Sequence, residues 1–487
     1  MKLDVFMRYH ALACDYDGTI AWDGRVDERT IEALQQVRQS GRKLVLVTGR
    51  ELEDLIRVFP KLELFDRVVA ENGALLYRPA SSEETPLAEA PPEAFVRELR
   101  RRSTQRVSAG RVIVSTWRPC ETIAVEVIRD LGLELQVIFN KGAVMILPSG
   151  VNKATGLNAA LLELGLSRHN VVGVGDAEND HAFLGLCECS VAVANALDTL
   201  KRRVDWVTAG GHGDGIVELA RSLITSDLRQ LEDRLHHRLS LGKRADGRDV
   251  LIRPYGMNVL IAGSSGGGKS TLAASFLERL EEQAYQFVII DPEGDYSTFQ
   301  AAVVLGDDRS APSVSEVLDL LSKPEQNAVV NLIGVPLKER PPIFEALLPR
   351  IQELYARTGR PHWIVIDEAH HVLPSSWKVA GPPVSREMYS LMIVTLEPER
   401  VSQAVLSSMD LVIAIGDDPD ATLRTFGEIV SQPPARLGRI AVSPGEAVAW
   451  FRHTPENPFW FRSSLPRAER RRLRTRPGAR SRTDREG

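Results

Sequence analysis

Two acidic residues, Asp15 and Asp17, end an apolar stretch that starts at Ala11 and lead into a turn at Gly18. Residues two apart in a strand point the same way, so both carboxylates can face one pocket at the carboxyl end of that strand. Adjacent anions repel unless a cation or a proton lies between them, and Mg²⁺ suits such oxygen ligands. The same Asp-x-Asp-Gly pattern also occurs in turns and calcium loops, so the pattern alone leaves that alternative open.

Other apolar stretches in this half of the chain also end in polar residues. Thr48 follows a predicted strand, where it can either cap the next helix or hydrogen-bond a bound phosphoryl group. Asp176, Asn179 and Asp180 follow another apolar strand, at the same kind of strand end as the first acidic pair. Lys153 lies where a helix is expected to begin, a position at which lysine is usually solvated.

In this order the residues resemble the four motifs of the haloacid dehalogenase superfamily, over about residues 8–225. The resemblance implies a Rossmann-like α/β fold in which Asp15 attacks phosphorus and becomes an aspartyl phosphate. Asp17 would protonate the leaving oxygen and then deprotonate water, while Thr48 and Lys153 would hold the phosphoryl group. The implied Mg²⁺ ligands are Asp15, the Asp17 carbonyl and Asp176, with Asp180 close behind.

The long segment between Gly73 and Lys153 resembles the small α+β C2 cap of the type IIB, Cof-like subgroup. Its size resembles that of phosphoglycolate or sugar-phosphate phosphatases. Arg111, Arg118 and Lys141 are candidate substrate contacts there, although each can equally be an ordinary surface charge. The expected core is 1–74 with 151–225, and the expected cap is 75–150, with a loop at 79–93, helices at 95–102 and 121–131, and strands at 111–117, 134–139 and 143–147.

The second half begins with a strand, a glycine-rich loop and a helix start that match the phosphate-binding P-loop pattern. Glycines let backbone N–H groups curl around phosphates, and the helix N-terminus favours the bound anion. Lys269 would reach the β and γ oxygens of ATP, and Ser270 would reach Mg²⁺. The predicted nucleotide-binding residues are Gly263, Gly266, Gly267, Gly268, Lys269, Ser270, Thr271 and Asp367.

A second apolar stretch ends in two acids, Asp367 and Glu368. Asp367 would hold Mg²⁺ through water, and Glu368 would polarise the attacking water. The second acid suits ATP hydrolysis better than nucleotide storage. Helices alternate with the remaining buried strands, so a mostly parallel sheet is expected.

This half resembles the HerA/VirB4-like branch of the FtsK-HerA ATPases over about residues 240–462, which implies a RecA-like P-loop domain. The resemblance depends on 291–296, 366–370 and Thr395. It departs from the branch in the residues after Thr395 and in having the phosphatase unit where HerA translocases have a β-barrel. Ring ATPases of this branch use an arginine from a neighbouring subunit, which implies a homo-oligomer. The candidates are Arg400, Arg424, Arg436 and Arg439.

Three domains are expected from the length of 487 residues. The segment 226–250 is predicted as a charged amphipathic helix and a turn that link the phosphatase to an ATPase at 251–462. The arginine-rich tail at 463–487 either grips the phosphates of a nucleic acid or is a disordered, solvated terminus.

The composition gives no global attraction to nucleic acid, because the net charge is −5. No apolar run approaches the roughly 18 residues of a membrane span, and no signal peptide is expected at the start. The four cysteines are interpreted as buried, reduced thiols of a cytoplasmic protein.

Together these patterns predict a Mg²⁺-dependent phosphomonoesterase, acting on a sugar-phosphate or a phosphoglycolate-like ester, fused to a domain that hydrolyses ATP. One alternative is a nucleic-acid translocase or processing ATPase with an accessory phosphatase. Another is a phosphatase that ATP binding switches. The expected cofactors are therefore Mg²⁺ and ATP, and the expected partner is a small phosphorylated substrate.

Overall fold

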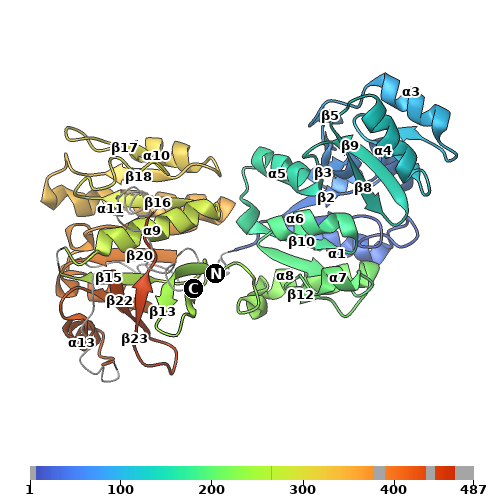
Figure 1. Ribbon diagram of the computed structural model, residues 1–487. Helices are drawn as coiled ribbons and strands as arrows, with labels where there is room; N and C mark the ends of the chain where they lie inside the picture. Colours follow the sequence, from blue (N-terminus) through green and yellow to red (C-terminus); the bar gives the residue numbers. More distant parts are fainter. Residues whose placement is uncertain (1–6, 265, 378–389, 435–444, 467–487) are drawn as a thin grey trace, which may run out of the picture. The chain divides into compact units, whose positions relative to one another are not determined.

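The computed structural model describes residues 7–264, 266–377, 390–434 and 445–466, and these form two compact units (Figure 1). One unit is Met7–His236, and the other begins at His237. The arginine-rich tail from residue 467 onward lies outside the described residues, as do Arg436 and Arg439.

A twisted sheet forms the centre of the first unit, with its strands in the order β12-β11-β10-β1-β2-β3-β4-β5. The strands from β12 to β3 run parallel, and β4 and β5 continue the sheet as an antiparallel hairpin. The strands are β1 (Ala11–Asp15), β2 (Lys43–Val47), β3 (Arg67–Ala70), β4 (Leu75–Arg78), β5 (Glu83–Pro86), β10 (Val171–Gly175), β11 (Cys189–Ala192) and β12 (Trp206–Val207).

Helices cover this sheet, which explains why every residue of β1 is buried (Figure 1). The Asp27 side chain accepts a hydrogen bond from the Thr30 amide and caps α1. The Asn152 side chain caps α5 in the same way. The helices are α1 (Glu28–Gln39), α2 (Leu52–Val58), α5 (Lys153–Glu163), α6 (His181–Leu186), α7 (Asp198–Lys201) and α8 (His212–Ser226).

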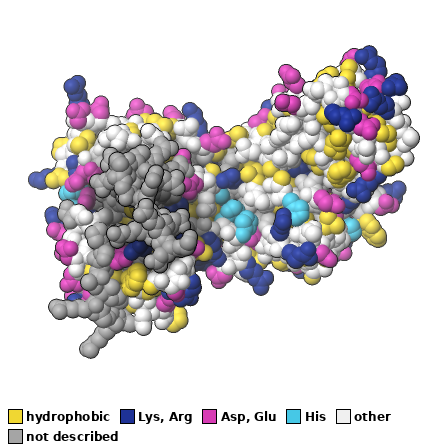
Figure 2. All heavy atoms as spheres, in the orientation of Figure 1, with side chains coloured by type: hydrophobic (Ala, Val, Ile, Leu, Met, Phe, Trp, Pro, Cys, Tyr) yellow, Lys and Arg dark blue, Asp and Glu magenta, His cyan; other side chains and the backbone are white. Residues whose placement is uncertain are grey.

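The cap is a small antiparallel sheet, in the order β6-β7-β9-β8, with two helices packed on one face. Its elements are α3 (Glu93–Arg102), β6 (Ser108–Ala109), β7 (Val114–Trp117), α4 (Glu121–Asp130), β8 (Leu135–Asn140) and β9 (Ala143–Pro148). Figure 2 shows Lys and Arg side chains gathered over α3, whose last turn contains Arg100, Arg101 and Arg102.

Two expectations about the start of the cap are wrong. Residues 79–93 were expected to form a loop, but they contain β5, which pairs with β4 at the edge of the core sheet. An edge strand is held by backbone hydrogen bonds and needs no apolar pattern, so composition did not reveal it. Since β4 and β5 extend the core sheet, the cap begins after them and not at residue 75.

The second unit is built on one mixed sheet, in the order β14-β13-β23-β22-β21-β15-β20-β19-β16-β18-β17. The strands from β21 to β17 are parallel, and the other four are antiparallel. The strands are β13 (Leu239–Arg244), β14 (Asp249–Ile252), β15 (Val259–Gly263), β16 (Phe287–Asp291), β17 (Val303–Leu305), β18 (Ala328–Asn331), β19 (Trp363–Ile366), β20 (Ser390–Thr395), β21 (Leu411–Ile415), β22 (Glu446–Phe451) and β23 (Phe459–Ser463).

Two apolar clusters cover the two faces of this sheet. The cluster on one face includes α9, and the cluster on the other includes α10, α11 and α13. The α/β fold class predicted for both halves is thereby confirmed. The helices are α9 (Lys269–Glu282), α10 (Val314–Leu321), α11 (Arg340–Thr358), α12 (Gln403–Leu406) and α13 (Pro419–Ile429).

The helical linker predicted within 226–250 is wrong. Helix α8 ends at Ser226 because Asp227 and Leu228 adopt left-handed backbone conformations, with φ of 50° and 57°. The Asp227 carboxylate is bound there by the Arg42 guanidinium at 2.8 Å. From residue 239 the chain enters β13 and then β14, so the part of the segment expected to link the domains belongs to the second sheet.

All four cysteines are buried and none is in a disulfide, as predicted. Within the described part of the chain, none of the helices has both the length and the hydropathy required to cross a bilayer.

Candidate active sites

Three neighbouring strands of the first unit bring polar residues to one edge of the sheet. Asp15 ends β1, Thr48 follows β2, and Asp176 follows β10, and β1 lies between the other two strands. Carboxylate oxygens of Asp15, Asp176 and Asp180 all lie within 4.8 Å of one another. These residues were predicted to meet at the carboxyl edge of the sheet, and they do.

Lys153 lies at the centre of this cluster. Its side chain is only 1% exposed, and its Nζ lies 2.5 Å from Asp15 Oδ1 and 2.6 Å from Asp180 Oδ1. The other oxygen of Asp180 accepts hydrogen bonds from the Asp176 and Ala177 amides, each at 2.8 Å. Lys153 is therefore buried in an ion-pair network instead of being solvated at the start of its helix.

The electrostatics of the cluster follow from this burial. Burial raises the pKa of Asp15, the neighbouring Asp180 raises it further, and Lys153 opposes the rise. Burial also raises the pKa of Asp176. Burial by itself lowers the pKa of Lys153, but Asp15 and Asp180 together hold that pKa above its ordinary value. The three buried carboxylates meet two ammonium groups, those of Lys153 and Lys141, so an excess of negative charge remains, which a bound cation would balance.

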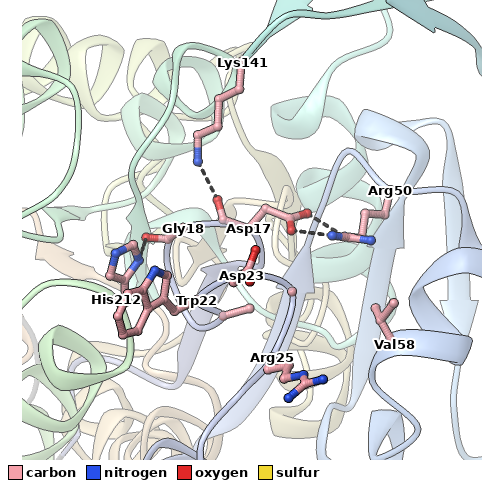
Figure 3. Close-up of a pocket in the computed structure, with 11 residues that line it drawn as sticks. Asp17, Gly18, Trp22, Asp23, Arg25, Arg50, Val58, Lys141 and His212 are labelled. Carbon is pink, nitrogen blue, oxygen red and sulfur yellow. Dashed lines mark hydrogen bonds and ion pairs between the residues drawn. The ribbon is translucent and has the colours of Figure 1, made fainter.

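Asp17 has a different environment from Asp15. The Arg50 guanidinium forms two parallel hydrogen bonds with its carboxylate, each at 2.7 Å (Figure 3). Arg50 also lies 2.5 Å from Asp54, so it bridges the strand end to α2. Asp17 lines a pocket of about 650 Å³, whereas Asp15 does not. The two carboxylates of the Asp-x-Asp pair are thus held separately, one buried and one at a pocket.

The expected Mg²⁺ ligands already surround a positive charge. The Lys141 ammonium, which extends from the turn between β8 and β9 of the cap, lies 2.9 Å from the Asp17 carbonyl (Figure 3) and 2.8 Å from Asp176 Oδ2. A Cβ built on Gly18 would lie 2.3 Å from that same carboxylate oxygen. These hard oxygen donors, convergent on a cation and kept clear by a glycine, fit Mg²⁺.

The other two candidate substrate contacts, Arg111 and Arg118, have partners outside this cluster of carboxylates. Arg111 pairs with Glu84 and Glu53. The Arg118 guanidinium lies 5.3 Å from the centroid of the Phe139 ring.

In the second unit, the glycine-rich loop follows β15 and leads into α9. A Cβ on Gly263 would lie 1.8 Å from the Ile415 carbonyl, so only glycine allows β21 to approach. Gly266 and Gly268 have φ of +76° and +98°, and a Cβ built on either would meet no atom within 4 Å. Lys269 Nζ lies 3.1 Å from the Ser264 carbonyl of its own loop. The described part of this loop therefore has free space next to Gly266 and Gly268.

The two acids predicted to act on ATP lie beside this loop. β20 lies between β15 and β19 in the sheet, so Thr395 ends the strand next to both the loop and Asp367. Burial raises the pKa of Asp367 to about 7. Burial also raises the pKa of Glu368, and the nearby Lys269 opposes that rise. His370 Nδ1 lies 3.4 Å from the Glu368 carboxylate and 3.3 Å from the Thr395 hydroxyl.

Known proteins match the two units separately. The family model of haloacid dehalogenase-like hydrolases matches residues 12–103 and 111–219. A phosphoglycolate phosphatase of Haloarcula marismortui is 31% identical over 219 residues, which are 42% of this chain and 94% of that protein. The chain belongs to the haloacid dehalogenase-like hydrolases. A phosphoglycolate phosphatase of Methanothermobacter thermautotrophicus is 28% identical over 220 residues, 43% of this chain and 97% of that protein.

The second unit matches a different model, that of the central domain of the helicase HerA, over residues 251–338. The predicted combination of a Cof-like hydrolase with a HerA-like domain is thereby confirmed. Among solved structures, one from Thermoplasma acidophilum is 18% identical, covers 44% of this chain and 97% of its own, and has a TM-score of 0.39.

Sequence reasoning missed how the hydrolase core holds its cap. Glu71 is 1% exposed, and its carboxylate accepts hydrogen bonds from the backbone amides of Arg111, Val112 and Ile113, at 2.7 to 2.9 Å. A Cβ on Gly110 would lie 2.4 Å from the same carboxylate. Glu71 therefore fixes the loop between β6 and β7 of the cap, a role visible only once residues 40 apart in sequence meet.

Arg50 was missed for the same reason, because its partner Asp17 is 33 residues away in sequence. Asn179, predicted beside the metal site, donates a hydrogen bond to Asn72 at 3.0 Å. Among the candidate arginine fingers, Arg400 pairs with Glu397 and Arg424 with Asp420, each within its own chain.

Proposed function

We propose that the hydrolase unit cleaves phosphate monoesters through a covalent intermediate on Asp15. The observation that carries this proposal is the environment of Asp15, which ends the central strand with Lys153 at 2.5 Å. A buried, fixed carboxylate next to an ammonium is a suitable nucleophile for a phosphoryl group, because the ammonium neutralises charge on the incoming phosphate.

In the first step, an Asp15 oxygen forms a bond to phosphorus as the bond to the leaving oxygen breaks. Asp17 donates a proton to that oxygen, so at least one of its two hydrogen bonds from Arg50 must be released for this oxygen to carry the proton. In the second step, Asp17 takes a proton from water, which attacks the aspartyl phosphate and releases inorganic phosphate. Thr48 and Lys153 are assigned to the phosphoryl oxygens throughout.

Mg²⁺ would be held by Asp15, the Asp17 carbonyl and Asp176, with Asp180 fixing the loop that carries Asp176. When bound, the ion would offset the repulsion between these carboxylates and the phosphate dianion. Lys141 must leave the Asp17 carbonyl for this ligand set to form, since it occupies the same oxygens.

The relatives point to a small substrate. Both are named phosphoglycolate phosphatases, and each is covered over nearly its whole length by this chain. We therefore assign the site to phosphomonoesters of small organic molecules, the class that includes phosphoglycolate.

For the second unit, we propose ATP binding and hydrolysis. The assignment depends on the loop of Gly263–Lys269, on Asp367 for Mg²⁺ and on Glu368 for the attacking water. The position of β20 between the loop strand and the acid strand supports it, because Thr395 then faces both. Ser270 and Thr271 complete the expected phosphate and Mg²⁺ contacts.

Two substitutions in the full chain test the assignment. Asp15→Asn should abolish hydrolysis of para-nitrophenyl phosphate and leave ATP hydrolysis intact, since only the nucleophile of the first unit is lost. Lys269→Ala should have the opposite effect. Loss of both activities in either variant would show that the two units do not carry separate active sites.

Nucleic acid as a partner of the ATPase unit is supported by the match to the HerA central domain. Duplex DNA should then stimulate ATP hydrolysis, and the stimulation should fall steeply with salt because phosphate contacts release counterions. An ATPase rate that DNA does not change would contradict nucleic acid as a partner of this unit and would not affect the phosphatase proposal.

A further inference from the structure

An exposed tryptophan lies at the mouth of the hydrolase site and is nevertheless held in one orientation. Trp22 is 73% exposed. Its ring stacks on His212, with centroids 5.8 Å apart and planes inclined by 11° (Figure 3). Backbone hydrogen bonds in both directions between Trp22 and Arg25, at 2.9 and 3.0 Å, close the hairpin that carries the ring.

His212 is itself anchored to the catalytic loop. Its Nδ1–H donates a hydrogen bond to the Gly18 carbonyl at 3.0 Å, and its amide donates one to Asn195 Oδ1 at 2.7 Å. Asn195 also donates to the Gly18 carbonyl, at 2.8 Å. One face of Trp22 is thus fixed against the catalytic loop, while the side chain stays largely open to solvent. The exposed side of an aromatic ring held in this way can stack on a flat ring of a ligand.

The pocket beside Trp22 lies on the side of Asp17. It has a volume of about 650 Å³ and is lined by Asp17, Trp22, Arg25 and Lys141 among others. Because Asp17 is assigned to protonate the leaving oxygen, the leaving group must occupy this side of the site. Pockets of this volume accommodate drug-sized molecules, so the space far exceeds what a two-carbon acid fills.

The charges around the pocket indicate a second anionic group on the ligand. Arg50 is neutralised by Asp17 and Asp54. Arg25, by contrast, is exposed and lines the pocket together with the exposed Asp23, and among the described residues no ion pair joins the Arg25 guanidinium to that or any other carboxylate. An unpaired arginine next to an aromatic face is suited to an anion carried by a stacked ring.

We propose that Trp22 and Arg25 select a phosphomonoester whose leaving group carries a flat ring and a second anionic group. The ring stacks on the open face of Trp22, and the second anion pairs with Arg25. This inference rests on the proposed phosphatase function and specifies its substrate class. Nucleoside bisphosphates carry both features, whereas sugar bisphosphates carry the second anion without a flat ring.

Steady-state kinetics with three probes test the proposal: phosphoglycolate, adenosine 3′,5′-bisphosphate and fructose 1,6-bisphosphate. In the wild type, KM for adenosine 3′,5′-bisphosphate should be lower than KM for phosphoglycolate and for fructose 1,6-bisphosphate. Base–aromatic stacking lost on alanine substitution corresponds to roughly a 5- to 150-fold effect. Trp22→Ala should therefore raise the KM of adenosine 3′,5′-bisphosphate relative to phosphoglycolate by that factor, with a smaller change in kcat, and Trp22→Phe should restore most of the loss.

Arg25→Gln should raise KM for adenosine 3′,5′-bisphosphate more than KM for adenosine 5′-monophosphate, because only the former offers the second anion. Trp117→Ala is the matched control, since Trp117 is also exposed, at 55%, but does not line the pocket. It should leave all KM values within about twofold.

A KM ratio that is the same in Trp22→Ala as in the wild type would overturn the inference while the phosphatase function stands. Wild-type protein that prefers phosphoglycolate or fructose 1,6-bisphosphate to adenosine 3′,5′-bisphosphate would overturn it too. If the wild type hydrolyses none of these esters, nor para-nitrophenyl phosphate, the proposed function itself fails together with the inference.

Discussion

Lys141 competes with the metal for its ligands, so removing its charge should tighten Mg²⁺ binding. Its ammonium contacts the Asp17 carbonyl and the Asp176 carboxylate, two of the oxygens assigned to Mg²⁺. Lys141→Met keeps the length of the side chain and removes the charge. The backbone φ of +47° is equally unfavourable for both residues, so the turn between β8 and β9 should persist.

The size of the effect follows from exposure. The Lys141 side chain is 48% exposed, although Asp176 is only 5% exposed. A half-exposed ion pair contributes up to about 1 kcal/mol. Mg²⁺ must break this pair in order to bind, so in the wild type the pair weakens metal binding by that free energy. Since 1.4 kcal/mol corresponds to a tenfold change in affinity, Lys141→Met should lower the Kd for Mg²⁺ by about fivefold.

Isothermal titration of metal-stripped protein with MgCl₂, at fixed ionic strength and without nucleotide, measures this Kd. Arg100→Met is the matched control, because Arg100 is an exposed cap arginine on α3. It removes one positive charge from the same cap and should leave the Kd nearly unchanged. An unchanged or weaker affinity in Lys141→Met would refute the competition. Equal tightening in both variants would attribute the effect to net charge alone.

Three further outcomes are expected. Gly18→Ala should abolish Mg²⁺ binding in the same titration with every ligand intact, because a Cβ there would lie 2.3 Å from the Asp176 carboxylate; normal affinity would contradict this. Glu71→Gln should raise hydrogen exchange in the loop between β6 and β7 of the cap and lower the free energy of unfolding by roughly 1–3 kcal/mol, since three backbone amides lose a charged acceptor; unchanged exchange would show that Glu71 does not hold this loop. The hydrogen bond to Asp205 raises the pKa of His236, so the native state binds the proton more tightly than the unfolded state. This stabilisation is fully present below the unfolded pKa of about 6.5 and is lost as pH rises through the folded value. Calorimetric melting of the hydrolase unit should therefore occur at lower temperature at pH 8 than at pH 6. The corresponding loss in the free energy of unfolding should be below about 1 kcal/mol, because the imidazole is 41% exposed. His236→Asn should remove that difference.

The sequence was sufficient to predict those site residues whose positions depend on the order of strands, loops and helices along the chain. Asp15 and Asp176 each end an apolar parallel strand, and parallel strands bring their carboxyl ends to one edge. The glycine-rich loop likewise lies between a strand and a helix, and its positive-φ glycines at 266 and 268 fit that role.

What sequence could not reveal depends on contacts between distant residues. The Arg50 clamp on Asp17 and the Trp22–His212 stack each join segments that no local periodicity relates. The segment after Ser226 was predicted as a helix from its charge pattern, but tertiary contacts of Asp227 end α8 there. β5 was missed because pairing with β4, and not burial, defines it.

The most direct test of the central claim is to trap the covalent intermediate. Asp17→Asn protein mixed with para-nitrophenyl phosphate and Mg²⁺ should accumulate an acyl phosphate, because this leaving group needs no proton while hydrolysis of the intermediate needs a base. Acid quenching, borohydride reduction and peptide mass spectrometry would locate it. The account predicts reduction at position 15 alone, in a yield that Asp15→Asn eliminates. A phosphoryl group on another residue, or turnover without any trapped species, would contradict it.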